Sequence, residues 1–306
     1  MASETKKKGP GRPRKTPQKT PPAKRGVIDT PDNPYNIVEL SYDKADTIKD
    51  LSSYWKTLNV EYVVFNFVPG KLIIYTKSYR EDNWIQHTVV GKKMISYYCR
   101  EMVTAMVRFK DIDLVFQKMD KECTLLSITL DTNKRTRQID IASHNNSDIP
   151  EYFKVEQVVD SAVVKQYNGV FTEDIPYPLH INMPSKWFKK TISDVKNFED
   201  KWTISKFPGG QVHFSYNSAN GHVEAKAVPP KKMIVQDDII GPFSVTVMAN
   251  VIKPTSSAML ADNLLLKASC DGRRMWMTAV MDDGAITVDI LANIVGTKTS
   301  TETKSS

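Results

Sequence analysis

Three lysines on a predicted helix are the strongest candidates for binding residues in this sequence. Lys186, Lys189 and Lys190 share the outer face of a helix whose inner face carries an apolar stripe. A row of amines on one helix face can neutralise phosphates without reading bases. A lysine-rich outer face can also be merely solvated. Other features of the sequence are needed to distinguish phosphate binding from simple solvation.

The sequence contains no recognisable catalytic or metal-binding signature. The histidines are scattered over different segments without metal-ligand spacing, and no GxxxxGK[ST] phosphate loop occurs. Asp282-Asp283-Gly284 is typical of a hairpin turn, and Asp237-Asp238 has no partner acid at nuclease-like spacing. We therefore expect neither an enzyme nor a cofactor or metal.

The lysine-bearing helix belongs to a unit that recurs along the chain. Each unit is an alternating strand, an amphipathic helix and further strands, and four copies in two halves predict two similar α+β domains. The apolar stripes are Ile48, Leu51, Trp55 and Leu58; Phe109, Ile112, Phe116 and Met119; and Phe188, Ile192, Val195 and Phe198, with a fourth, short helix around Ser256–Leu260.

Composition changes mark the expected domain boundaries. Residues 1–34 form a basic, Pro-rich tail that cannot bury a core, and we expect it to be disordered. An N-terminal domain over 35–158, a connector over 159–176 and a C-terminal domain over 177–296 follow, and 297–306 is a polar tail.

The charge and cysteine content restrict the class of protein. The net charge of +7 favours a polyanionic partner, although the tail supplies much of the excess. No apolar run approaches the ~20 residues that cross a bilayer, and the N-terminus is unlike a signal peptide. Cys99, Cys123 and Cys270 have no CxxC spacing and are expected to be reduced. These features predict an intracellular protein.

The tail contains a possible nucleic-acid motif. Gly11-Arg12-Pro13 followed by Arg14-Lys15 resembles an AT-hook, in which an extended Gly-Arg-Pro lies in an A·T-rich minor groove. Pro10 stands where that motif has a second arginine. The same residues would also serve as a polyanion tether or a nuclear-import signal.

The whole arrangement resembles the sliding clamps, the PCNA-like processivity factors of DNA polymerases, and within them those of African swine fever virus and related large DNA viruses. The tail GPGRPRK, the LSYD strand before the first helix, and SSAMLADNLLLKASC…MWMTAVMD…ITVDILANI carry the resemblance. It implies two domains, each with two helices on curved antiparallel sheets, and a homotrimer that closes into a six-domain ring.

The resemblance implies that the helices line a hole around duplex DNA. Sequence-independent contacts with phosphates are then expected from Lys49, Lys56, Lys110, Lys118, Lys121, Lys186, Lys189, Lys190 and Lys253.

The resemblance also implies two protein-binding surfaces. The strand Glu151–Gln157 should pair with His222–Val228 of the next subunit; the expected contacts are Tyr152, Lys154, Glu156, Val223, Ala225 and Ala227. DNA polymerase and other replication and repair proteins should insert short hydrophobic motifs beneath the connector, at Val158, Val159, Val163, Val164, Ile294 and Val295.

Two other functions stay open at the level of sequence. One is a monomeric or dimeric, non-ring processivity factor with an open basic face; the other is an architectural or transcription protein that uses the AT-hook-like tail. Acids such as Asp46, Asp50 and Asp113, which share helices with the lysines, argue against the open factor. The expected location is a viral replication site in the host cytoplasm or nucleus.

Overall fold

The computed structural model describes most of the chain from Gly26 onward. The described residues are 26–78, 83–119, 123, 125–131, 138–144, 150–158, 176–195, 201–206, 211–217, 224–227, 231, 233–237, 243–248, 261–269, 274–281 and 284–293.

Strands dominate both halves. The first half contains β1 (Gly26–Val27), β2 (Asn36–Tyr42), α1 (Ala45–Thr57), β3 (Val60–Val68), β4 (Lys71–Ser78), β5 (Trp84–Val90), η1 (Gly91–Lys93), β6 (Ser96–Cys99), β7 (Val103–Arg108), α2 (Phe109–Lys118), β8 (Leu125–Asp131), β9 (Gln138–His144) and β10 (Glu151–Glu156). The second half contains β11 (Leu179–Pro184), α4 (Ser185–Val195), β12 (Lys201–Lys206), β13 (Val212–Asn217), β14 (Glu224–Ala227), β15 (Ile234–Asp237), β16 (Phe243–Met248), β17 (Asn263–Ala268), β18 (Arg274–Met281) and β19 (Ile286–Asn293).

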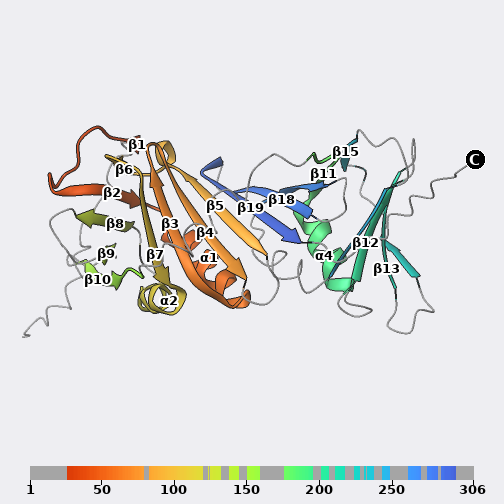
Figure 1. Cartoon of the computed structure of the whole chain (residues 1–306), viewed down its shortest axis with the longest axis horizontal. Helices are drawn as coiled ribbons and strands as arrows, with labels where there is room; N and C mark the ends of the chain where they lie inside the picture. Colours follow the sequence, from red (N-terminus) through yellow and green to blue (C-terminus); the bar gives the residue numbers. More distant parts are fainter. Residues whose placement is uncertain are drawn as a thin grey trace, which may run out of the picture.

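The strands form three sheets, of which the largest joins the two halves. A six-stranded sheet has the order β1-β6-β2-β8-β9-β10, and a four-stranded sheet has the order β14-β13-β12-β16. The nine-stranded sheet, β15-β11-β17-β18-β19-β5-β4-β3-β7, runs through both halves because β19 pairs antiparallel with β5, with Ile286 opposite Val89. Figure 1 shows this sheet in the middle of an elongated molecule, with the smaller sheets at its two ends.

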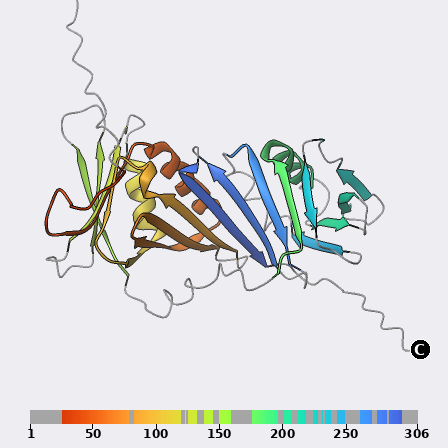
Figure 2. The ribbon, with the colours of Figure 1, turned by 90° about the horizontal axis from the view of Figure 1, so that it is seen from above.

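The helices lie on one side of the nine-stranded sheet, as Figure 2 shows. Their apolar stripes are buried as predicted wherever the structure describes the side chains: Trp55, Ile112 and Phe188 have exposed fractions of zero. Phe198 and the side chain of Val195 lie outside the described part. Ile48, Leu51, Leu58, Phe109, Phe116, Met119 and Ile192 are buried with them in one continuous core. The 3.6-residue period of these apolar positions therefore fixes which helix face meets the sheets.

Two sequence expectations differ from the structure in extent. The tail expected over residues 1–34 contains a described strand, because β1 at Gly26–Val27 pairs in parallel with β6. The expected helix around Ser256–Leu260 lies outside the described residues, which contain the three α-helices α1, α2 and α4. The domain boundaries at 158 and 177 stay a prediction.

Candidate nucleic-acid interface

Most of the predicted phosphate-binding lysines lie on the solvent side of the three helices. On α1 and α2, Lys56, Lys110 and Lys118 are exposed, and Lys49 is half-buried. On α4, Lys186 and Lys190 are exposed and Lys189 is half-buried. Lys121 and Lys253 lie outside the described residues.

The lysines of α1 and α2 are balanced by acids on the same helices. Lys56 Nζ lies 3.7 Å from Asp113 Oδ2, which joins the two helices. The carboxylate of Asp113 also accepts hydrogen bonds from Ser52 Oγ, at 3.1 Å, and from Gln117. Side chains of both helices hold Asp113 in place, and its carboxylate partly neutralises the charge of Lys56. By contrast, α4 carries three lysines within two turns and is the most cationic of the three described helices.

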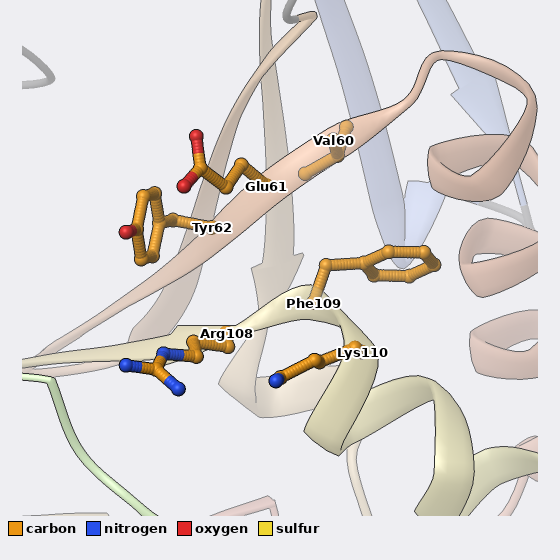
Figure 3. Close-up of a pocket in the computed structure, with 6 residues that line it drawn as sticks. All are labelled: Val60, Glu61, Tyr62, Arg108, Phe109 and Lys110. Atoms are coloured by element: carbon orange, nitrogen blue, oxygen red, sulfur yellow. The ribbon is translucent and has the colours of Figure 1, made fainter.

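A groove runs past the beginning of α2, where strands β3 and β7 meet it. Figure 3 shows Arg108 and Lys110 on one side of this groove and Glu61 and Tyr62 on the other. The cavity has a volume of about 420 Å³, and Val60 and Phe109 complete its lining. A second hollow continues from it towards Lys56 and Asn59. Two cations, two aromatic rings and a single acid give this groove a net positive lining suited to phosphate.

The two strands predicted to meet at a subunit boundary both lie at sheet edges. β10 is the last strand of the six-stranded sheet and β14 is the first of the four-stranded sheet. The outward-facing residues of β10 are exposed: Tyr152 retains 74% of its accessible surface, and Lys154 and Glu156 are exposed as well. Ala225 and Ala227 pair with Tyr216 and Phe214 of β13, and Val223 lies outside the described residues.

Neither a metal centre nor a membrane-spanning helix is present in the part of the chain that the structure describes. There, no cluster of three or more His, Cys, Asp or Glu side chains could hold a metal ion. No helix within the same part is long and apolar enough to cross a bilayer.

Comparison with known proteins identifies the fold. No protein-family model matches the chain. A protein of African swine fever virus, described as uncharacterized, is 22% identical over 293 residues, covering 90% of this chain and 94% of its own; its forms in isolates from Kenya and Namibia match equally. The crystal structure of proliferating cellular nuclear antigen from Entamoeba histolytica superposes with a TM-score of 0.68 at 14% identity, covering 85% of this chain and 99% of that one.

The chain has the sliding-clamp fold. The paired α+β units and the sheet that joins them, predicted from the sequence repeat, are thereby confirmed as a PCNA-like domain pair.

Of the residues expected to form the partner pocket, the structure describes Val158. The amide of Val158 donates a 2.7 Å hydrogen bond to the carbonyl of Met106, and its side chain packs against Met106 and Val64. Val158 thus adds to the edge of the nine-stranded sheet just before the connector. Val159, Val163, Val164, Ile294, Val295 and the AT-hook-like residues 11–15 lie outside the described residues.

Sequence reasoning missed Arg108, whose side chain lines the groove beside Lys110. It precedes the helical stripe by one residue, so a search for lysines on helix faces passes over it. The sequence does indicate Arg108 in another way, because it is the N-cap of α2 and directly follows an alternating strand.

Proposed function

We propose that this protein is the DNA sliding clamp of a large DNA virus, a polymerase processivity factor that closes as a homotrimer around duplex DNA. The sliding-clamp fold and the relationship to a viral protein support this assignment. The observation on which the ring depends most is that β10 and β14 are both edge strands, of sheets that lie at opposite ends of the molecule.

Pairing of β10 with β14 of the next subunit would cover both edges. An unpaired strand edge is a site for uncontrolled association, and a closed ring removes it. Two large apolar side chains at this edge are exposed. Tyr152 lies on β10 and has an exposed fraction of 74%. Leu114 lies on α2, the helix that contacts β10, and has an exposed fraction of 56%. Burial of such side chains at the new interface would add to the backbone hydrogen bonds.

Inside the ring, lysines would meet the phosphates without reading sequence. Weak contacts of this kind suit sliding, because a closed ring stays on DNA by topology and needs little affinity. The helices α1 and α2 contribute balanced charge, so we assign the strongest phosphate contacts to Lys186, Lys189 and Lys190 of α4.

Partner proteins are proposed to bind beside the connector. The polymerase and other replication and repair proteins would place hydrophobic side chains near Val158 and the outer face of the nine-stranded sheet. The site of action would be the viral replication site in the host cytoplasm or nucleus. The AT-hook-like tail would add contacts with A·T-rich DNA.

A processivity assay tests the function. The double substitution Lys189→Glu/Lys190→Glu should shorten the products of primer extension by the viral polymerase, because it places negative charge against the phosphates. The trimer should assemble as in the wild type. The exposed Lys231→Glu, which lies outside the helices, is the control. Product lengths equal to those of the control would contradict the assignment of α4 to the hole.

A further inference from the structure

The groove at the beginning of α2 starts on the sheet face that lies opposite the helices. Val63 of β3 belongs to the main core beneath the helices, whereas Tyr62 and Val64 belong to a small separate cluster with Met106. Arg108 lies opposite Tyr62 in the pairing of β3 with β7 and therefore shares its face. The side chains of Tyr62 and Arg108 thus lie outside the surface that the helices form.

From this face the groove runs round the end of the sheet to the helix side. Val60, Glu61 and Phe109 line both the cavity of about 420 Å³ and the second hollow of about 530 Å³. The second hollow reaches Lys56 in the last turn of α1 and Asn59 just after it. The two hollows are therefore one continuous groove, which joins the proposed lining of the hole to the opposite face of the sheet.

The core fixes the floor of this groove. Val60 and Phe109 have exposed fractions of 5% and 8%. The ring of Phe109 packs edge-on against the fully buried Trp55, with the ring centroids 6.4 Å apart. At the other end Tyr62 packs against the buried Val64. The groove is thus shaped by side chains that already have their packing partners, as preformed ligand sites are.

Cations outnumber acids along the groove. Arg108 and Lys110 are exposed, and neither forms an ion pair with a residue that the structure describes. Lys56, at the far end, lies 3.7 Å from Asp113, but its side chain keeps 64% of its surface exposed. Glu61 is the acid among the lining residues of both hollows. The groove therefore offers a path of three positive charges to a polyanion.

Tyr62 adds an aromatic ring to this path. Figure 3 shows the ring across the groove from the side chain of Arg108. Cations that follow a groove neutralise successive phosphates, and an aromatic ring stacks on a base of any sequence, which together are typical of sites for single strands. The bases of a duplex are stacked inside the double helix and cannot reach such a ring. An acidic peptide would use the cations alone.

We propose that this groove binds a single strand of nucleic acid, with its phosphates at Arg108, Lys110 and Lys56 and one base stacked on Tyr62. The choice of nucleic acid as the polyanion rests on the proposed function. The groove gives an unpaired strand a path from the helix side to the opposite face of the sheet, while the duplex is held by α4.

Salt-dependent binding of a single strand to the full-length protein tests the cations. The probe is a fluorescein-labelled oligothymidine of about 12 nucleotides, followed by fluorescence anisotropy. Each phosphate contact with a single strand contributes ~0.7 to the slope of log K against log salt. Arg108→Glu/Lys110→Glu should therefore lower the slope by about 1.4 and the affinity on the order of tenfold at 0.1 M salt.

Lys92→Glu/Lys93→Glu is the matched control, because it reverses two exposed charges at η1. A 2.8 Å hydrogen bond from the amide of Gly91 to Gly70 holds η1 at the far end of β3. Six residue steps of ~3.3 Å, or roughly 20 Å, separate that end from Tyr62. The control should change the slope by less than half as much as the groove variant. Equal slopes in the two variants would overturn the proposal.

Two substitutions of Tyr62 test the stacked base. Tyr62→Leu keeps apolar bulk against Val64 but removes the ring, and it should weaken binding at least about fivefold without changing the salt slope. Tyr62→Phe keeps the ring and should bind within about twofold of the wild type. Equal affinities of the two variants, both shown to be folded by thermal unfolding, would overturn the stacking role of Tyr62.

Photocross-linking locates the strand independently of affinity. An oligothymidine that carries iododeoxyuridine should attach to the peptide that contains Tyr62 when the wild-type protein is irradiated. The yield should fall in Arg108→Glu/Lys110→Glu, because the strand is no longer held in the groove. Attachment confined to peptides outside β3 and α2 would overturn the site.

A duplex of the same length separates this proposal from the proposed function. A tenfold loss for the single strand with a loss below about threefold for the duplex would support a single-strand site. Equal losses for both would overturn it, since the groove would then be part of a general polyanion surface. A monomeric wild type with the single-strand effect intact would support the groove and remove the ring. A trimer whose groove variants bind the single strand normally would remove the groove alone.

Discussion

At the scale of single residues, His87 is a titratable group that the fold buries completely. Its side chain is fully buried, with ring contacts to Tyr54 and Trp55 at centroid distances of 6.5 and 5.6 Å. Neither ring nitrogen makes a well-formed hydrogen bond within the described part of the chain. Burial lowers the pKa of His87 from 6.5 to about 3, and the backbone of Ile74 opposes this only in part.

This burial predicts an acid-dependent loss of stability. Above pH 6.5 the imidazole is neutral in both the folded and unfolded states, so the free energy of unfolding loses nothing to its protonation. As the pH falls from 6.5 towards 3, the unfolded chain binds a proton that the folded chain does not. The free energy of unfolding should fall by up to ~1.4 kcal/mol per pH unit from this group.

Denaturant unfolding between pH 4 and 7 measures the effect. His87→Gln should flatten the pH dependence by about one proton, and His213→Gln, at an exposed histidine, is the matched control. A slope unchanged by His87→Gln would show that other groups cause the acid sensitivity.

At the scale of elements, β10 is the strand whose exposure makes the clearest prediction. Tyr152→Glu should leave the fold stable, because the side chain is 74% exposed in the single chain. It should weaken trimer formation on the order of tenfold or more, because a charge would be buried at the subunit boundary. Concentration-dependent sedimentation measures the association, and Tyr35→Glu, at another exposed tyrosine, is the control. Equal association in the two variants would remove Tyr152 from the interface.

The helices and most strands were predictable because their apolar positions repeat with a fixed period. The stripes through Trp55, Ile112 and Phe188 identify the buried faces without any knowledge of the fold. The strand β1 was missed because its two residues, Gly26 and Val27, are too few to show a period. Only the pairing of β1 with β6 in the structure reveals it.

The cationic groove could not be predicted for a different reason. Arg108 lies opposite Tyr62 through the pairing of β3 with β7. These residues are distant or unremarkable in sequence, and tertiary structure alone brings them together. By contrast, lysines on one helix face are visible in sequence because helical spacing places them together.

At the scale of the whole molecule, the nine-stranded sheet makes the two halves one unit. β19 and β5 share six registered positions, from Ile286 opposite Val89 to Leu291 opposite Trp84. The strand β19 therefore closes onto the first half, and the sheets that end in the edge strands β10 and β14 lie at opposite ends of the molecule. Such a unit is suited to head-to-tail association into a closed ring.

The mass of the full-length protein in solution tests the central claim most directly. Light scattering over a range of concentrations and salt should give about three times the chain mass of 34.6 kDa, independent of salt, if β10 and β14 close a preformed ring. A mass of one or two chains at every concentration would contradict the ring. The protein would then be an open processivity factor, held on DNA by its basic tail.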